Sequence, residues 1–264
     1  MGPLNGWSLN AIGLPANFAL PIQRSHRFER RISRFQKVVK MTDDSARPSG
    51  GGGQFTVAHL FADHGVECEV LSRLGYVVRF TIDPEPSPFD DQTVQIDLME
   101  RMPTGVFDLV VMHPNCGDVA DLTSISGDSD EQEFQIARAR EIAQQIADDY
   151  IIENKPREEL RDPVVLNGRM FGLPIKYERA FETSFPVKSP PRERELGEKT
   201  VTPYYYSDRS IEWWQQVKGY SGDYPKEHLA KNAVPACYLE TILRSWLETK
   251  GQDATEPQDN NSPA

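Results

Sequence analysis

The feature of this sequence that most restricts its fold is a series of short apolar runs, each of which stops at polar residues. Phe107–Met112 is the clearest of them, and a largely apolar run of this length is typical of a strand buried on both faces of a parallel sheet. Runs of similar character cover Phe55–Phe61, Gly75–Ile82, Thr93–Ile96 and Tyr150–Ile152, and we expect each to be a strand. The pattern predicts an α/β fold with a doubly wound, mostly parallel sheet.

Segments with helical spacing separate several of these strands. Gly65–Leu74 suits a helix after the first strand, and Glu131–Asp149 carries apolar residues at helical spacing before the last one. Leu229–Thr249 has the same spacing and predicts a closing helix packed on the rest of the chain. In doubly wound sheets ligands bind at the carboxyl ends of the strands, so the ends of these strands are where function is expected.

Composition narrows the class of protein. The 264-residue chain has 38% hydrophobic residues, enough for one main domain. Its formal net charge of -11 argues against a protein that coats nucleic acid by charge alone, so any contact with DNA must be local. Three cysteines without a close pair indicate a reduced, cytoplasmic chain, and no apolar stretch approaches the ~18 residues that span a membrane. We expect a soluble monomer.

Two neighbouring strands of the predicted sheet end in residues suited to chemistry. The strand over 107–112 runs into His113-Pro114-Asn115-Cys116, where the proline halts the strand and would hold the cysteine at the edge of the sheet. The next strand stops at Glu153-Asn154-Lys155-Pro156. A thiol and a carboxylate on neighbouring strand ends are placed to act on one ligand from two sides.

These motifs resemble those of the cytosine-5 DNA methyltransferases, in particular small phage and bacterial members. That family follows one strand with Pro-Pro-Cys and the next with Glu-Asn-Val, and Pro114-Asn115-Cys116 and Glu153-Asn154-Lys155 stand in the same order. Residues 163–173 resemble a segment that leads, in the family, to a basic motif, of which Arg179 and Phe181 remain here. Asn232-Ala233-Val234-Pro235 is similar to the Gly-Asn-Ala-Val-Pro signature that opens the family's last helix.

The resemblance, which spans about residues 55 to 247, implies a mechanism. Cytosine is methylated at carbon 5 after a thiolate has added to carbon 6, and Cys116 would be that thiolate. Glu153 would hold or protonate ring nitrogen 3, Asn154 would help to place its loop, and Arg179 would contact the base carbonyl or a phosphate. A base in duplex DNA must be flipped out to reach such a site.

The resemblance also implies S-adenosylmethionine as the methyl donor, although the cofactor motif is degenerate. The family opens with Asp-x-Phe-x-Gly-x-Gly-Gly, of which Phe61 and Gly65 remain, while Asp63 and His64 add bulk where the cofactor would come close. Asp83 and Asp97 follow the second and third strands and would contact the cofactor there. The implied cofactor-binding residues are Phe61, Gly65, Asp83, Asp97, Pro114 and Asn232.

These observations divide the chain into four parts. Residues 1–54 are a basic arm and a Gly-rich linker, 55–185 a Rossmann-like core of the class I S-adenosylmethionine methyltransferase fold, and 186–249 a small lobe with the closing helix. Residues 250–264 are a polar tail, and we expect the two ends to be disordered. The arm would suit phosphate contacts, but we favour a solvated segment or one that precedes a true start at Met41.

Three functional hypotheses remain open. The first is an active DNA cytosine-5 methyltransferase with an altered cofactor site, and the second is an inactive relative that acts as a DNA-binding or interaction module. The third is a related enzyme that keeps the thiol and the carboxylate but uses another donor. We expect no metal site, because His59, His64 and Cys68 lack a fourth ligand at the usual spacing.

Overall fold

The computed structural model describes residues 55–115, 133–156, 159–188, 192–195 and 200–253. Predictions for the arm over 1–54, for Cys116 and for the tail beyond residue 253 therefore lie outside the described residues. Among the helices of the described ranges, none is long and apolar enough to cross a membrane.

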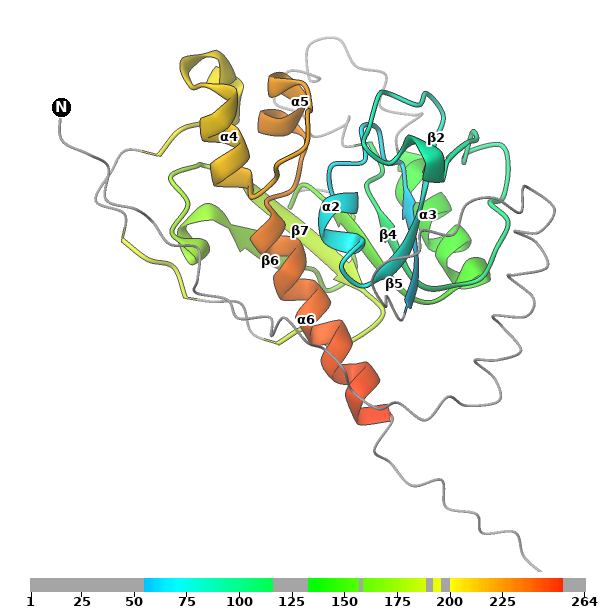
Figure 1. The fold of residues 1–264 in the computed structure, drawn as a ribbon. Coiled ribbons are helices and arrows are strands. Elements are labelled where there is room, and N and C mark those ends of the chain that lie inside the picture. The colour runs from blue at the N-terminus through cyan, green and yellow to red at the C-terminus, as the bar shows by residue number, and fades with distance from the viewer. Residues whose placement is uncertain (1–54, 116–132, 157–158, 189–191, 196–199, 254–264) are drawn as a thin grey trace, which may run out of the picture.

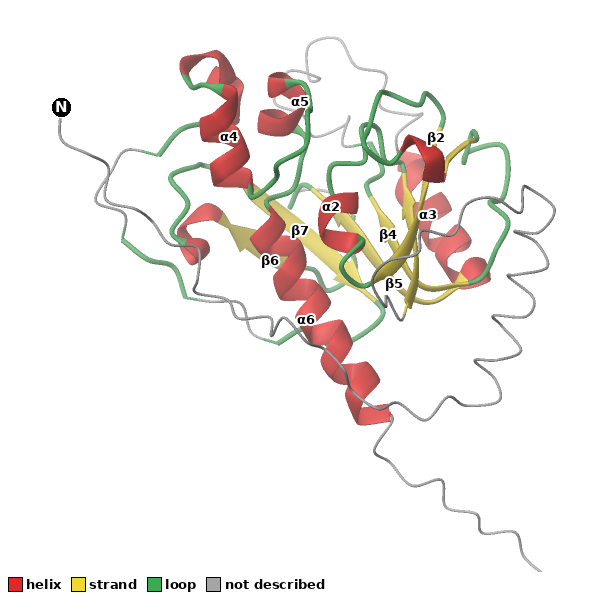
Figure 2. Ribbon diagram, in the orientation of Figure 1, coloured by secondary structure: helices red, strands yellow, loops and turns green. Residues whose placement is uncertain are grey.

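One seven-stranded sheet organises the described residues, with the strand order β3-β2-β1-β4-β5-β7-β6. The first five strands of this order run parallel, and β7 runs antiparallel to both of its neighbours. Figure 2 shows this sheet at the centre of the molecule with helices on either side. The strands are β1 (Phe55–Leu60), β2 (Gly75–Thr81), β3 (Thr93–Gln95), β4 (Phe107–Met112), β5 (Ala147–Asn154), β6 (Val164–Asn167) and β7 (Glu178–Thr183).

Helices cover both faces of the sheet (Figure 1). One face packs against α3, and the other packs against α2 and α6, with α4 and α5 beyond the upper end of α6 in the view. In the described ranges, short 3-10 helices lie in the connections: η1 (Asp90–Gln92), η3 (Gly168–Phe171) and η4 (Pro203–Asp208). The α-helices are α2 (Cys68–Leu71), α3 (Glu133–Ile146), α4 (Ile211–Lys218), α5 (Lys226–Lys231) and α6 (Ala236–Asp253).

The alternation of side chains along the central strands produces two hydrophobic layers. Leu109 and Val111 of β4 face the α6 side, whereas Val110 and Met112 face the α3 side, and all four are buried. The residues of α4, α5 and α6 share the first of these layers with the sheet, and Trp246 of α6 is fully buried in it. The α/β fold with a mostly parallel, doubly wound sheet that the apolar runs predicted is therefore confirmed.

The structure corrects three predicted helix boundaries. The predicted helix Gly65–Leu74 is reduced to the single turn Cys68–Leu71, and the left-handed φ of 64° at Gly65 keeps that residue out of a right-handed helix. The predicted helix Glu131–Asp149 ends at Ile146, because Ala147 already pairs with Phe107 in the sheet. Sheet pairing here overrides the helical spacing of the sequence.

The predicted closing helix is two helices. Helix α5 ends at Lys231 and α6 begins at Ala236, directly after Pro235. Proline has no backbone N–H to donate and disfavours helical conformation in the residue before it, so the chain turns between the two helices. Helix α6 also continues to Asp253, so the first residues of the predicted disordered tail are helical.

Candidate active site at the carboxyl edge of the sheet

A cavity of about 150 Å³ opens at the carboxyl ends of β1, β4 and β5. It brings together most of the residues that the sequence selected, while Cys116 lies outside the described residues and its neighbour Asn115 is part of the cavity wall. Asp83 and Asp97 do not line it. The selected residues that do line it are Phe61, Gly65, Pro114, Glu153, Asn154, Arg179 and Asn232.

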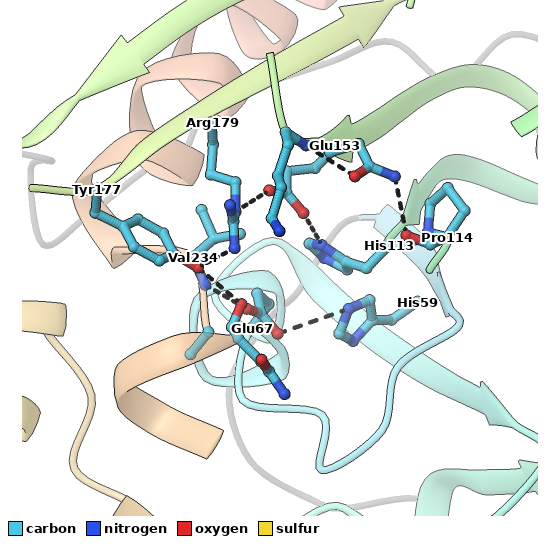
Figure 3. A network of polar contacts seen from close by, with 12 residues as sticks. His59, Glu67, His113, Pro114, Glu153, Tyr177, Arg179 and Val234 are labelled. Carbon is cyan, nitrogen blue, oxygen red and sulfur yellow. Dashed lines mark hydrogen bonds and ion pairs between the residues drawn. The ribbon is translucent and has the colours of Figure 1, made fainter. Parts of the chain in front are cut away.

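Glu153 is the centre of the polar side of this cavity. It ends β5 and is buried, with 5% of its surface exposed. Its Oε2 lies 2.8 Å from Nδ1 of His113 at the end of β4, and its Oε1 lies 2.8 Å from Nε of Arg179. The second contact is an ion pair whose angle is not that of a hydrogen bond. Figure 3 shows the carboxylate held between the two basic groups.

Arg179 is fixed by further contacts on the other side of its guanidinium. Its Nη2 donates to the hydroxyl of Tyr177 at 2.7 Å and to the carbonyl of Lys231 at 3.3 Å, and its Cζ lies 4.3 Å from the centre of the Tyr177 ring. The antiparallel pairing of β7 with β5 puts this arginine beside the end of β5. The guanidinium binds Glu153, and its predicted contact with a base or a phosphate stays a prediction.

Asn154 joins the ends of β4 and β5. Its Nδ2 donates to the carbonyl of Pro114 at 3.0 Å, and its Oδ1 accepts from the backbone N–H of Lys155 at 2.8 Å. The amide is buried, so both of its polar atoms depend on these protein partners. The contact with Pro114 holds the segment after β4 against the end of β5, and the loop-positioning role that the resemblance implies for Asn154 stays a prediction.

Three further residues at the floor of this site were not given a role from the sequence. His59 of β1, Glu67 before α2 and His113 after β4 form a cluster in which one nitrogen or oxygen atom of each lies within 4.8 Å of the others. Nε2 of His59 lies 3.9 Å from Oε2 of Glu67, and the rings of His59 and His113 meet edge to face with centroids 4.9 Å apart. Figure 3 shows the two rings and the Glu67 carboxylate turned toward one another.

The cluster is unusual in its burial. His59 is fully buried, and Nε2 of each histidine has no hydrogen-bond partner among the residues that the structure describes. Burial lowers the pKa of His59 well below its usual value and raises the pKa of Glu67. Burial alone would lower the pKa of His113, but the neighbouring carboxylates of Glu67 and Glu153 outweigh it and raise that pKa. Each unpartnered buried nitrogen costs about 1–3 kcal/mol.

Glu67 also connects distant parts of the chain. Its Oε1 accepts from the backbone N–H of Val234 at 2.8 Å, which holds the segment before α6 to the loop after β1. His113 could have been found from the sequence, because it stands at a strand end beside Pro114. Glu67 and His59 carried no such signal, because the first lies in a segment predicted to be helical and the second lies within a strand.

The cofactor side of the site is built around Arg79. Gly65 has a φ of 64°, and a Cβ at this position would lie 2.6 Å from Cδ of Arg79, so the glycine is required by the arginine packed beneath it. Arg79 is fully buried, donates to the carbonyls of Asp63 and Glu85, and pairs with Asp90 at 3.0 Å. The loop after β1, which would approach the cofactor, therefore packs on the buried side chain of Arg79 and is hydrogen-bonded to it through the carbonyl of Asp63.

The remaining predicted cofactor residues are more accessible. Asp83 follows β2 and is exposed, and Asp97 follows β3 and is half-buried, with Oδ1 accepting from the backbone N–H of Met99 at 2.8 Å. Asn232 is exposed after α5, and its Nδ2 lies 3.3 Å from Nδ1 of His228. Phe61 is half-buried at the end of β1 with a positive φ of 55°.

Comparison with known proteins identifies the fold. Neither family models nor curated protein sequences match this chain. Among solved structures, the Entamoeba histolytica methyltransferase EhMeth superposes with a TM-score of 0.54 over 75% of this chain and 99% of that one, at 9% identity. The chain thus has the α/β, Rossmann-like fold of that methyltransferase.

Two other solved structures are similar over a smaller region. A putative DNA modification methyltransferase encoded within an Escherichia coli prophage has 15% identity over 58% of this chain and 54% of its own length, with a TM-score of 0.42. A mutant of Spodoptera frugiperda DNMT2 has 14% identity over 55% and 56%, with a TM-score of 0.34. The chain spans about half the length of each of these two proteins.

Proposed function

We propose that this protein is an S-adenosylmethionine-dependent DNA methyltransferase that methylates cytosine at carbon 5 through a covalent adduct on Cys116. The observation that carries the proposal is the convergence of Glu153, Arg179 and the Pro114 loop on one cavity at the carboxyl edge of a methyltransferase-like sheet. Cys116 follows the last described residue of that loop by one position. In the sequence Cys116 directly follows Asn115, which lines the same cavity as the buried carboxylate of Glu153.

The residues present fit the cofactor in part. The cavity of about 150 Å³ is smaller than the ~300–1,000 Å³ of typical small-molecule sites, so it has room for a base or one end of a cofactor only. Asp83 and Asp97 stand outside it at the ends of β2 and β3, where they would hold the ribose and the adenine end, with Phe61 against the ring. S-adenosylmethionine, when bound, would supply the methyl group as a sulfonium.

Cys116 would act on the base from the loop after β4. Its thiolate would add to carbon 6 of cytosine, which makes carbon 5 nucleophilic. Once carbon 5 had taken the methyl group, loss of the carbon 5 proton and expulsion of the thiolate would restore the aromatic ring. The contact from Asn154 to the carbonyl of Pro114 fixes the preceding part of the loop. A reacting thiol has to be held in this way, because small displacements of a nucleophile cost a large part of its rate.

Glu153 would hold ring nitrogen 3 of the same base. A carboxyl group that donates to nitrogen 3 withdraws electrons from the ring during thiolate addition, and His113 and Arg179 set the position of that group. Burial of the pair excludes water and strengthens these interactions.

The proposed substrate is a base extruded from DNA rather than a base in the duplex. The cavity is recessed at the sheet edge, and a base can enter it only when it is unstacked. The chain carries a net charge of -11, so its contacts with the phosphate backbone must be few and local. Because the salt dependence of DNA binding grows with the number of phosphates contacted, methylation by this protein should fall only modestly as the salt concentration rises.

A radiolabel experiment tests the proposal. Wild-type protein is incubated with DNA and S-adenosylmethionine that carries a tritiated methyl group, and 5-methylcytosine is identified by mass spectrometry of the digested DNA. We expect labelled 5-methylcytosine from the wild type and none from Cys116→Ala. Cys237→Ala is the matched control, because Cys237 lies on α6 outside the cavity and should keep full activity. Label on another atom or on protein alone would contradict the proposal.

A further inference from the structure

We propose that His59, Glu67 and His113 form a binding site for one divalent transition-metal ion, with Zn²⁺ the best match to the ligand set. The proposal goes beyond the methyltransferase function and does not depend on it. The sequence predicted no metal site, because the set it contains close together, His59, His64 and Cys68, lacks a further ligand. The fold instead brings His59 of β1 together with two residues from other segments, Glu67 and His113.

The spacing of the three ligand atoms fits a metal ion. Three atoms that lie within 4.8 Å of one another share a point within about 2.8 Å of each (4.8 Å divided by √3), and Zn–N and Zn–O bonds are about 2.0–2.2 Å long. Side-chain shifts of less than ~1 Å would therefore complete the coordination. Two imidazoles with one carboxylate are a ligand set of zinc enzymes and of non-haem iron sites, which leave further positions open.

The second nitrogen of each imidazole is already held as a metal-binding histidine requires. Nδ1 of His113 lies 2.8 Å from the Glu153 carboxylate, which accepts its proton and turns Nε2 away from Glu153. Nδ1 of His59 lies 3.2 Å from Sγ of Cys68. Both Nε2 atoms are thus left with a lone pair and, among the described residues, with no hydrogen-bond partner.

The third ligand is held in a matching way. Oε1 of Glu67 accepts from the backbone N–H of Val234, and Oε2 is the oxygen that faces Nε2 of His59 at 3.9 Å. A cation between these atoms would satisfy two buried imidazole nitrogens and neutralise a buried carboxylate at once.

The site is reachable from the cavity. Glu67 and His113 both line the cavity, whereas His59 lies behind them and is fully buried. An ion held by the three side chains would therefore keep an open coordination position on the cavity side, where a water molecule or a ligand oxygen can bind. His113 also contacts Glu153, the carboxylate proposed to hold the base. A bound ion would therefore change the electrostatic environment of that carboxylate.

Metal binding to the full-length protein tests the inference directly. Protein freed of metal by a chelator is titrated with ZnCl2 by calorimetry, and bound zinc is counted by mass spectrometry after gel filtration. We expect one Zn²⁺ per chain for the wild type. Absence of saturable binding would overturn the proposal. The measurement uses neither S-adenosylmethionine nor DNA, so its failure is distinct from failure of the proposed methyl transfer.

Near-isosteric variants locate the site. Glu67→Gln keeps an oxygen for the Val234 N–H and His113→Gln keeps a polar group beside Glu153, so both should fold while losing a ligand. We expect each to weaken Zn²⁺ binding by more than about 100-fold, and Glu153→Gln, which removes the carboxylate behind His113, to weaken it by about 10–100-fold. His228→Gln is the matched control, since His228 lines the same cavity outside the cluster. Unchanged affinity in the Glu67 and His113 variants would contradict the assignment.

A second measurement needs no variant. Substitution of the wild-type protein with Co²⁺ should give visible d–d bands of a site with nitrogen and oxygen ligands. A strong sulfur-to-cobalt charge-transfer band would show that a cysteine binds the ion and would overturn the proposed ligand set. Cys116→Ala should bind Zn²⁺ as the wild type does while losing methyl transfer, which separates the metal site from the proposed nucleophile.

Discussion

On one side of the cavity, side chains from β4, β5 and β7 hold one another: Glu153 binds His113 and Arg179, and Asn154 binds the Pro114 loop. On the other side, the loops after β1 and β2 are supported by Arg79 from below, while Asp83 remains exposed. The side proposed to act on the base is therefore preorganised, whereas the side proposed to hold the cofactor presents a supported loop and accessible acidic groups. This difference matches the sequence, in which the base motifs are well kept and the glycine motif is degenerate.

This difference between the two sides indicates which residues of such a site can be substituted without loss of its function. A group that must hold a developing charge needs fixed partners, because reorganisation during the reaction is costly. A loop that only binds a cofactor can change its residues when another element supports it, and Arg79 provides that support beneath Gly65. The two sides should thus respond differently to substitution.

The largest effect is expected from Glu153→Gln. The variant keeps the shape of the side chain but removes the charge that faces His113 and Arg179 and the group proposed to hold ring nitrogen 3. The rate of methyl transfer should fall by about 10²–10⁴-fold, which is the usual contribution of a general acid or base to the rate. The initial rate of tritium transfer measures it. Glu178→Gln, an exposed carboxylate on the neighbouring strand, should retain activity, and an equal loss in both variants would contradict the role of Glu153.

Arg79→Met tests the support of the cofactor side. The substitution keeps much of the apolar stem but leaves the carbonyls of Asp63 and Glu85 without their donor. The free energy of unfolding should fall by about 3 kcal/mol, as urea denaturation would measure. Arg73→Met is the control: its side chain is 52% exposed and paired with Glu240, so the loss should stay below about 1 kcal/mol. Equal losses would remove Arg79 from the account of the loop.

A pH series tests the rigidity of the base side. Burial alone would raise the pKa of Glu182 on β7, but hydrogen bonds from Arg140, from the Arg161 N–H and from Tyr150 lower it below its usual value of 4.5. A carboxylate whose pKa is lower in the folded than in the unfolded state stabilises the fold. For Glu182 this stabilisation is fully present above pH 4.5 and is lost as the pH falls through the folded-state pKa.

Glu182→Gln should therefore be less stable than the wild type at pH 7, by about 1–2 kcal/mol, and this gap should close as the pH falls below the normal carboxylate range. Urea denaturation at several pH values measures the gap. Glu100→Gln, which changes an exposed carboxylate, should give a curve parallel to that of the wild type. A gap that widens toward acid would reverse the sign of the argument.

The smallest effect is expected from Asp83→Asn on the cofactor side. Asp83 would be one of several groups that hold the cofactor, so its loss should reduce the binding free energy of S-adenosylmethionine by about 1.4 kcal/mol. This corresponds to an affinity about tenfold lower. Calorimetric titration measures the affinity, with Asp91→Asn, another exposed aspartate nearby in η1, as the control. An unchanged affinity in Asp83→Asn would place the ribose elsewhere.

Local patterns in the sequence were sufficient for the five parallel strands and for the motifs at the ends of β4 and β5, but they did not predict the antiparallel strand β7 or its neighbour β6. The runs that predicted strands are strands, because a buried parallel strand must be apolar, and the motifs at the ends of β4 and β5 meet because neighbouring parallel strands end at one edge. The roles of Cys116, Glu153 and Arg179 in catalysis stay predictions.

Contacts between residues far apart in the chain could not be predicted from the sequence. The helix spacing before β5 did not reveal that Ala147 pairs with Phe107, and the contact between Glu67 and the Val234 N–H joins residues 167 positions apart. The histidine cluster depends on three segments that only the folded sheet brings together. Side chains that meet through tertiary structure leave no mark in local periodicity.

The most direct test of the central claim is covalent trapping on DNA that contains 5-fluorocytosine, because fluorine at carbon 5 blocks release of the thiolate. If Cys116 and the cofactor act on one base in this cavity, a stable protein–DNA complex should form with the wild type only when S-adenosylmethionine is present. It should be absent from Cys116→Ala and present in Cys237→Ala. A complex that forms with Cys116→Ala, or no complex with the wild type and its cofactor, would contradict the account.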